Sequence, residues 1–393
     1  MYGVESLICS LGVSSGKDSR EGRQMSSVAG RDMRLDFFRG LALITIFVNH
    51  VPGNALEHLT TRNFGFSDAA ESFVLMSGIA AGLAYSRGLL SGEFAKSSVR
   101  VWSRALKLYA VHISITLAAI VILMCGLRVF GETTVFRNVN ASAVLADPIS
   151  ALAGVFTLGH QLGYFNILPL YMILLAATPF MIRLAGTSRA VLLTSSAAIW
   201  LVSGLFNLNM PNFPTQGGWF LNPFSWQLVY VVGLLAGISA RQGKPLIPRS
   251  RLLFWASAAF LLYSLIIVRT GYWNFAIHEG LPSFIGAFDK TYLSLQRLLH
   301  VLALAYVVTN LGFVTRMARS AAAAPVNYLG RNSLSVFAAG SVICILLQVM
   351  KSIYPTTAPL DLALIATGLA LQYAVAAAGS IKTVPSAMPV ART

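Results

Sequence analysis

The first long apolar stretch of the chain contains two residues that could take part in chemistry, Arg39 and His50, with ten residues between them. On an α-helix, eleven steps of about 1.5 Å place them roughly 16 Å apart along the axis, and about three turns bring them near one face. Moving an acyl group from a thioester to a hydroxyl requires a base for the hydroxyl proton, and histidine is the usual choice near neutral pH. Arginine supplies forked donors for the phosphates of coenzyme A (CoA) or for a carboxylate. The pair is therefore suited to acyl transfer.

Both residues also have structural interpretations that the sequence leaves open. The His50 imidazole could instead hydrogen-bond to a neighbouring helix. Arg39 could pair with Asp36 or extend its charged end to the lipid headgroups.

Two carboxylates, Asp68 and Glu71, lie one helical turn apart at the expected outer end of the next apolar segment. A short loop joins this segment to the first one, so either carboxylate could meet His50 and orient its ring. The alternative is an ion pair with Arg62. Further along the same segment, Ser77 and Gly78 are typical of helix packing in membranes.

Other charged residues are weaker candidates. Arg100, Arg104 and Lys107 recur at helical spacing before the third apolar segment, where they could hold a CoA pyrophosphate or anchor to lipid headgroups. Arg297 and His300 lie three apart on one face of a later segment, and we expect them to line the same cavity as the histidine of the first segment. No cluster of His, Cys or carboxylate residues has metal-ligand spacing, so we expect no bound metal.

The composition shows that the bilayer is the main solvent of this chain. Of its 393 residues, 56% are hydrophobic and 11% are charged, and the mean hydropathy is +0.68. This is too little polar surface to cover a soluble globule. The sequence predicts an all-α, polytopic integral membrane protein with about ten transmembrane helices, each long enough to cross about 30 Å of hydrocarbon. The expected spans are residues 36–52, 66–85, 105–127, 163–182, 190–208, 219–239, 252–268, 291–313, 333–350 and 360–379.

The formal charge of +15 comes from Lys and Arg residues in short clusters between the apolar segments. This distribution is typical of cytoplasmic loops under the positive-inside rule rather than of a nucleic-acid-binding face. It predicts that both termini are cytoplasmic. The three cysteines are odd in number and indicate no disulfide framework.

The chain divides into one large domain and two tails. Residues 1–30 are rich in Ser, Gly and charge and lack the apolar core of a secretory signal, so we expect a disordered cytoplasmic tail. Met25 or Met33 could be the true start. Residues 31–381 would form the transmembrane domain, and residues 382–393 a short cytoplasmic tail.

Several loops have distinctive compositions. Residues 149–159 are apolar but too short to span a bilayer, and we expect a re-entrant or interfacial segment on the outer side. The loops at 209–218 and 270–287 are rich in Pro, Gly and aromatic residues, with Trp219 and Phe220 at an edge. These aromatic side chains could form a belt at the headgroups or stack against a sugar ring.

Four blocks of the sequence resemble the OpgC family, and the resemblance runs from about Arg31 to Gln348. The blocks are Arg34 to Asn54, Asn63 to Gly78, Gly217 to Gln227, and Asp289-Lys-Thr with Arg297 and His300. Members of this family are inner-membrane proteins that succinylate osmoregulated periplasmic glucans. The wider similarity is to acyltransferase family 3, whose ten-helix domain has an Arg, ten residues, His motif in the first helix; Arg39 and His50 match that spacing.

The resemblance implies an acyl donor taken from the cytoplasm, namely succinyl-CoA as a co-substrate with no permanently bound cofactor. It implies an acceptor hydroxyl on a periplasmic glucan at the cell inner membrane. His50 would be the base or acyl relay and Arg39 a donor-site residue, with Asp68 as the orienting carboxylate. An acidic residue often precedes the histidine in the family, whereas this chain has Asn49, which shifts weight onto Asp68 or Glu71.

The other site assignments combine spacing with these blocks. From their charge and helical spacing, Arg100 and Arg104 would contact CoA. The acceptor or acyl group would contact Arg297, His300, Trp219 and Asn222. Acetyl transfer to another polysaccharide is an alternative within this class. Outside it, a transporter for a polysaccharide or small anion could use the same charges, although no internal repeat supports an inverted topology. Membrane lipids are expected partners, and the oligomeric state is not indicated.

Overall fold

A computed structural model describes residues 32–278, 280–354 and 357–381, with side chains up to residue 378. The two predicted tails, residues 1–30 and 382–393, lie outside the described residues. From Arg34 onward, the described residues belong to one compact unit. The described ranges form helices and no β-strand, apart from an isolated bridge between Pro211 and Gly218.

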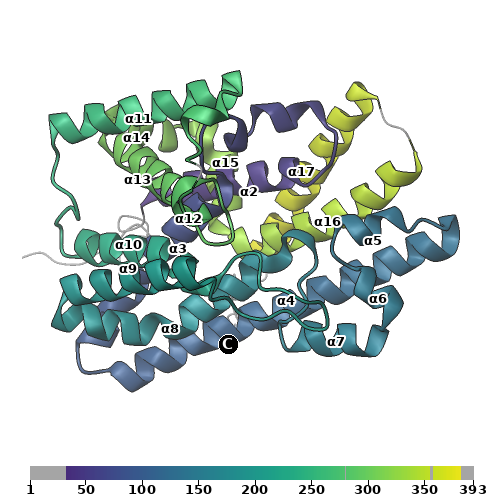
Figure 1. Ribbon diagram of the computed structural model, residues 1–393, viewed down its shortest axis with the longest axis horizontal. Coiled ribbons are helices and arrows are strands. Elements are labelled where there is room, and N and C mark those ends of the chain that lie inside the picture. The colour runs from purple at the N-terminus through teal and green to yellow at the C-terminus, as the bar shows by residue number, and fades with distance from the viewer. Residues whose placement is uncertain (1–31, 279, 355–356, 382–393) are drawn as a thin grey trace, which may run out of the picture. The chain divides into compact units, whose positions relative to one another are not determined.

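The long helices follow the chain in the order of the predicted spans. They are α2 (Met33–Asn49), α3 (Ala69–Leu90), α4 (Phe94–Phe130), α8 (Ile167–Thr187), α9 (Arg189–Phe206), α10 (Pro223–Arg241), α11 (Arg251–Thr270), α13 (Leu295–Asn310), α16 (Ser333–Ile353) and α17 (Ala358–Ile381). Shorter helices connect them: α5 (Thr134–Asn138), α6 (Ser142–Ala146), α7 (Pro148–Phe156), α12 (Ser283–Gly286), α14 (Gly312–Ala318) and α15 (Ala324–Arg331). Figure 1 shows this order along the chain.

Within the described residues, eight helices are long and apolar enough to cross a membrane, or up to nine if one bent pair counts as a span. That pair is α13 and α14, which meet at an angle of 82°. The all-α, polytopic membrane class is therefore confirmed. Each of the predicted spans falls on a helix, and the difference in number comes from α2, which has only 17 residues, and from the break after Asn310.

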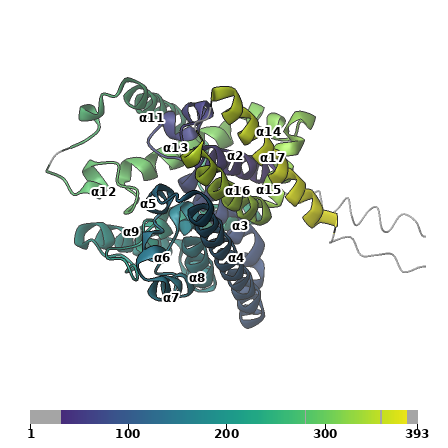
Figure 2. The same ribbon diagram turned by 90° about the vertical axis from the view of Figure 1, so that its right-hand side faces the viewer.

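Two predicted boundaries differ from the structure. α4 begins at Phe94, so Arg100, Arg104 and Lys107 lie within its first turns instead of before it. These turns continue the helix beyond its apolar part, which the search for apolar runs could not detect. The apolar segment at 149–159 forms most of α7, a helix too short to span a bilayer. α5, α6 and α7 lie beside α4 (Figure 2).

α3 and α10 pack against each other closely through small residues. A Cβ atom added at Gly78 would lie 2.2 Å from the Tyr230 carbonyl oxygen, and one at Gly82 would lie 2.4 Å from the Leu234 carbonyl oxygen. The opposing glycines behave in the same way, because a Cβ at Gly233 or Gly237 would lie within 2.2 Å of a carbonyl oxygen on α3. Both helices thus carry a Gly-x-x-x-Gly pair that lets the backbones touch. The helix-packing interpretation of Gly78 is confirmed.

Candidate functional site

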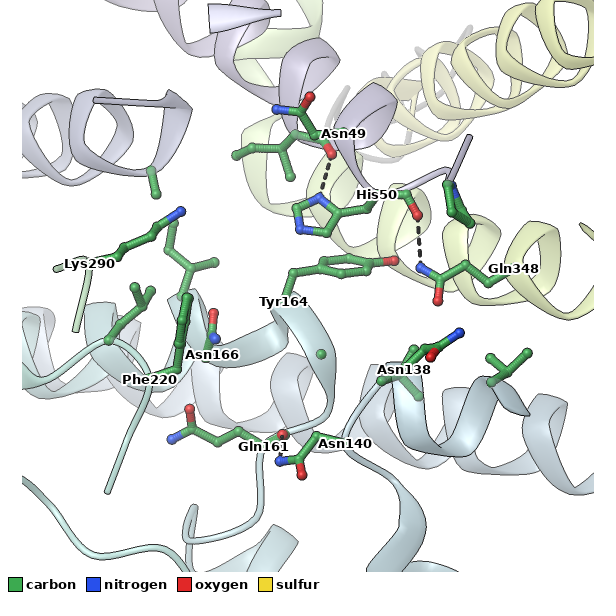
Figure 3. Close-up of a pocket in the computed structure, with 18 of the residues that line it drawn as sticks. Asn49, His50, Asn138, Asn140, Gln161, Tyr164, Asn166, Phe220, Lys290 and Gln348 are labelled. Carbon is green, nitrogen blue, oxygen red and sulfur yellow. Dashed lines mark hydrogen bonds between the residues drawn. The ribbon is translucent and has the colours of Figure 1, made fainter. Parts of the chain in front are cut away.

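A cavity of about 970 Å³ lies where the C-terminal end of α2 meets the loops around α5, α8 and α10. Its size is typical of a small-molecule site. The lining is rich in side-chain amides (Figure 3), together with three Tyr or Phe rings and two lysines. The amide residues are Asn49, Asn138, Asn140, Gln161, Asn166, Asn212 and Gln348. The Tyr and Phe residues are Tyr164, Phe220 and Phe337, and the lysines are Lys290 and Lys351.

His50 lies in the wall of this cavity, directly after the last residue of α2. A tight turn carries it there, because the His50 amide donates to the Phe47 carbonyl at 3.2 Å. The buried side chain of Asn54 holds the turn by donating to the carbonyl oxygens of Val48, at 2.9 Å, and Val51, at 2.5 Å. The end of α2 is therefore fixed by its own local sequence.

One hydrogen bond determines the tautomer of the His50 ring. Its Nδ1 lies 2.6 Å from the carbonyl oxygen of Ile46. A carbonyl oxygen can only accept, so Nδ1 carries the proton of the neutral ring and Nε2 keeps a lone pair. Figure 3 shows the second ring nitrogen on the side of the cavity away from this bond. The imidazole is thus arranged to accept a proton from a ligand.

Two further contacts position the histidine. The rings of His50 and Tyr164 have centroids 3.8 Å apart, and the Tyr164 hydroxyl donates to the Ser341 carbonyl at 3.0 Å. The side chain of Gln348 donates to the His50 carbonyl at 2.8 Å. Tyr164 reaches the cavity because Gly163 has a positive φ of 45°, a backbone conformation that glycine adopts without strain. Both partners come from segments distant in sequence.

A cluster of four charges lies beside the cavity, formed by Asp68, Glu71, Lys290 and Arg297. Arg297 contacts both carboxylates, at 2.6 Å from Glu71 and 3.2 Å from Asp68. The Lys290 ammonium contacts Asp68 alone, at 2.5 Å. Two positive and two negative charges balance each other in this cluster. Glu71 is fully buried beneath it, which such pairing makes tolerable.

The two carboxylates also build the start of α3. The Asp68 side chain accepts from the Ala70 amide at 2.8 Å, and the Glu71 side chain accepts from the Asp68 amide at 2.9 Å, which is a capping box. Burial alone would raise the pKa of the Asp68 carboxyl, but the charges of Lys290 and Arg297 outweigh it and hold that pKa well below its usual value. Asp68 is therefore ionised at neutral pH.

The expectation that Asp68 or Glu71 orients the His50 ring is wrong for this structure. Among the described contacts, both carboxylates bond to the α3 cap and to Lys290 or Arg297, while the Ile46 carbonyl holds Nδ1 of the histidine. The alternative ion pair of Asp68 with Arg62 is also wrong. Arg62 instead pairs with Glu57 at 3.1 Å. The two carboxylates therefore pair with cations that lie more than 200 positions further along the chain, and not with the nearer His50 or Arg62.

Trp219 and Asn222 were expected to contact the acceptor, but neither residue lines the described cavity. Trp219 is only 3% exposed, and its neighbour Phe220 lines the cavity instead. Asn222 is fully buried and caps α10 by accepting from the Phe224 amide at 3.1 Å. Its amide group donates to the Ser203 hydroxyl at 3.0 Å. Both residues therefore hold the loop that presents Phe220.

Arg297 and His300 likewise do not line the described cavity. The Arg297 side chain is 11% exposed and is occupied by the two carboxylates. The Nδ1 atom of His300 lies 2.7 Å from the Ser67 hydroxyl, and Gly65 packs against the ring. The two residues share one face of α13 as expected, but this face binds the start of α3.

The three predicted donor-site arginines lie away from the His50 cavity, whose described lining contains none of them. Arg39 donates to the Met76 carbonyl on α3 at 3.4 Å. Tyr171 lies within electrostatic range of Arg39 and Arg104, and Tyr85 within range of Arg100 and Arg104. The structure therefore brings these arginines from α2 and α4 around two tyrosines.

Sequence reasoning missed most of the residues around His50. Tyr164, Gln348 and Lys290 come from three separate regions. Lys290 lies in one of the blocks that resemble the family, but the sequence assigned none of the three residues a place beside the histidine. Phe220 was one of several aromatic candidates at loop edges. The frequent Asn and Gln residues between apolar segments were an available signal for the cavity. Amide side chains close to a membrane need polar surroundings, and a polar cavity provides them.

Comparison with known proteins identifies the family. The family described as OpgC protein matches residues 31–382, which is nearly the whole chain. A search of curated proteins found no match. The matched region contains every helix of the described residues and the complete cavity described above. The chain therefore belongs to the OpgC family, and this membership supports a general role as an OpgC-like acyltransferase.

Proposed function

We propose that the protein transfers a succinyl group from cytoplasmic succinyl-CoA to a hydroxyl of a periplasmic glucan, with His50 as the general base. The observation that carries the proposal is the His50 imidazole, held with Nδ1 protonated and Nε2 free in a cavity of about 970 Å³. Family membership supports the reaction class. Glucan as the acceptor suits a lining of amides with an exposed phenylalanine ring, since amides bond sugar hydroxyls and a ring can pack against a sugar face.

The proposed reaction is a direct displacement at the thioester. Nε2 of His50 removes the proton of the acceptor hydroxyl while the oxygen attacks the thioester carbonyl carbon. The carbon–sulfur bond breaks, and the thiolate of CoA leaves with the proton that the imidazolium returns. The products are a succinyl ester of the glucan and free CoA. No covalent bond to the protein is required.

The charge distribution supports an outer location for the cavity. The segments that line it, including residues 134–140, 212–221 and 348–352, are those that the positive-inside rule assigns to the outer side. Arg39 lies in the first half of α2, and Arg100 and Arg104 lie in the first turns of α4, towards the side that the positive-inside rule assigns to the cytoplasm. We propose that they hold the phosphates of CoA, so that its long arm runs along α2 towards His50. Eleven residues of helix correspond to about 16 Å between the two ends.

The test is transfer of isotopically labelled succinyl groups in membrane vesicles that contain the protein. Labelled succinyl-CoA supplied on the cytoplasmic side should yield a labelled glucan on the outer side, and mass spectrometry should find the succinyl ester. Glucans from cells without the gene should lack that ester. Unlabelled glucan with the wild-type protein present would refute the proposal. Movement of intact glucan without an ester product would favour the transporter alternative.

A further inference from the structure

Lys290 is the charged residue of the ionic cluster that faces the His50 cavity. Its side chain is 27% exposed, whereas Arg297 is largely covered and Glu71 is fully buried. Figure 3 shows its amino group directed towards the His50 ring across the cavity. Resting on the function proposed above, we propose that Lys290 binds the free carboxylate of a dicarboxylic acyl group and so makes the enzyme select succinyl over an uncharged acyl chain.

The backbone of Lys290 is held rigidly, which a specificity residue requires. The indole nitrogen of Trp226 donates to the Lys290 carbonyl at 2.9 Å. The backbone N–H of Asn222 donates to the carbonyl of the next residue, Thr291, at 3.3 Å. Both donors belong to the start of α10, which is a well-buried helix. The ammonium group is therefore presented from a fixed point in the cavity wall.

The Lys290 side chain keeps donors for a ligand. An ammonium group has three donors, and Asp68 accepts from it at 2.5 Å. Phe220, which also lines the cavity, has its ring centroid 5.8 Å from the ammonium nitrogen. Asp68 also contacts Arg297, so it keeps a cation when the lysine turns towards a ligand carboxylate. Lys290 can thus share its charge without leaving Asp68 unpaired.

Other cations near the cavity fit this role less well. Lys351 also lines it, but its side chain is 9% exposed and pairs with the buried Asp361. Arg62 pairs with Glu57 and does not belong to the described lining. Arg297 is needed for Glu71, which is fully buried and would otherwise lose its cation. Lys290 is therefore the best placed of the four.

The chemistry predicts selection by charge. Succinyl and butyryl groups have four carbons, but only the succinyl group ends in a carboxylate. A hydrogen bond between this carboxylate and an ammonium is stronger than a bond between neutral groups, because both partners are charged. A butyryl group has no carboxylate for Lys290, so the lysine would stay paired with Asp68 and would add nothing to the binding of the butyryl group. The wild-type enzyme should therefore prefer succinyl-CoA.

The test compares succinyl-CoA with butyryl-CoA as donors for the purified full-length protein and its glucan acceptor. For Lys290→Met, the ratio of kcat/KM for succinyl to that for butyryl should fall at least about tenfold, the effect of losing one charge-assisted hydrogen bond. Lys290→Arg should keep most of the preference, because it keeps the charge. If the methionine variant does not reach the membrane, the same ratio measured on Lys290→Gln decides.

The outcomes separate the two proposals. An unchanged ratio in the neutral variants, with the wild type still transferring succinyl, would overturn the role of Lys290 and leave the proposed function standing. A wild type that uses both donors equally would have the same effect. A wild type that transfers neither group would overturn both proposals. A lower ratio in the neutral variants, with preference retained by arginine, supports the role of Lys290.

Discussion

Two regions of the molecule are built on opposite principles. One is the contact between α3 and α10, and the other is the cavity at the end of α2. In the contact, four glycines let two backbones touch, and a methyl group at any of them would meet a carbonyl oxygen within 2.4 Å. In the cavity, amides, two lysines and His50 surround about 970 Å³ of space. The first region depends on the absence of side chains, and the second on their polar ends.

The difference indicates which substitutions change stability and which change activity. A packed interface has no room to adjust, so added volume must move a helix. A cavity wall tolerates smaller side chains, since the ligand space is already open to solvent. The ionic cluster at the start of α3 belongs to both regions, because Arg297 supports α3 while Lys290 faces the cavity.

The largest expected effect is on catalysis at the cavity. His50→Ala should lower the rate of acyl transfer by about 10²- to 10⁴-fold, the usual contribution of a general base. The amount of protein in the membrane and its thermal stability should change little, because His50 is only partly buried. The control is His58→Ala, which removes an exposed histidine and should leave the rate unchanged. Equal rates in both variants would rule out His50 as the base.

The next effect concerns the ionic cluster. Arg297→Met should lower the free energy of unfolding by about 3–5 kcal/mol, because it leaves the buried Glu71 without its cation. Thermal denaturation in detergent would measure this change. Arg87→Met replaces an exposed arginine on α3 and serves as the matched control. A melting curve for Arg297→Met that overlays the control would show that the cluster does not stabilise the start of α3.

A smaller effect is expected at the glycine contact. Gly78→Ala places a Cβ 2.2 Å from the Tyr230 carbonyl oxygen, so α3 and α10 must separate, at a cost of about 1–3 kcal/mol. Gly312→Ala is the control, since the nearest atom, on the flexible Arg316 side chain, lies 3.8 Å from its Cβ. Thermal denaturation should distinguish the two variants. Identical melting temperatures would mean that the backbones are not in contact.

The smallest effect is expected at the aromatic wall. Phe220→Leu should raise the KM for the glucan by roughly 2- to 10-fold, which corresponds to about 0.5–1.5 kcal/mol for an aromatic contact. The stability should not change, because the ring is half exposed. Phe224→Leu alters a neighbouring exposed ring outside the described cavity lining and should leave the KM as it is. A KM that rises equally in both variants would argue against contact between Phe220 and the acceptor.

The helices were predictable because the requirement that produces them is local. Each span needs a run of apolar residues that matches the hydrocarbon thickness, and such a run can be recognised without knowing its neighbours. The prediction failed at the start of α4, where the helix continues through Arg100 and Arg104. Backbone hydrogen bonds satisfy a helix in water as well as in lipid, so its polar turns left no apolar signal.

The candidate site was predictable only in part. The types and spacing of Arg39 and His50 indicated the chemistry, and a local hydrogen bond to Ile46 sets the tautomer of the ring. The partners of Asp68 were not predictable, since Lys290 lies 222 positions away. The nearer Arg62 was the reasonable expectation from sequence, and it pairs with Glu57 instead.

By itself, the sequence determined the membrane environment and the order of the helices, and it singled out Arg39 and His50 as candidates for acyl transfer. Hydrophobicity and backbone hydrogen bonding act over one helix at a time, so they can be read from one segment. Only the tertiary structure decided that Tyr164, Gln348 and Lys290 surround His50, and that Trp219 and Asn222 are buried supports. Electrostatic pairing and packing act through space, and each charge takes the partner that the packed helices bring nearest.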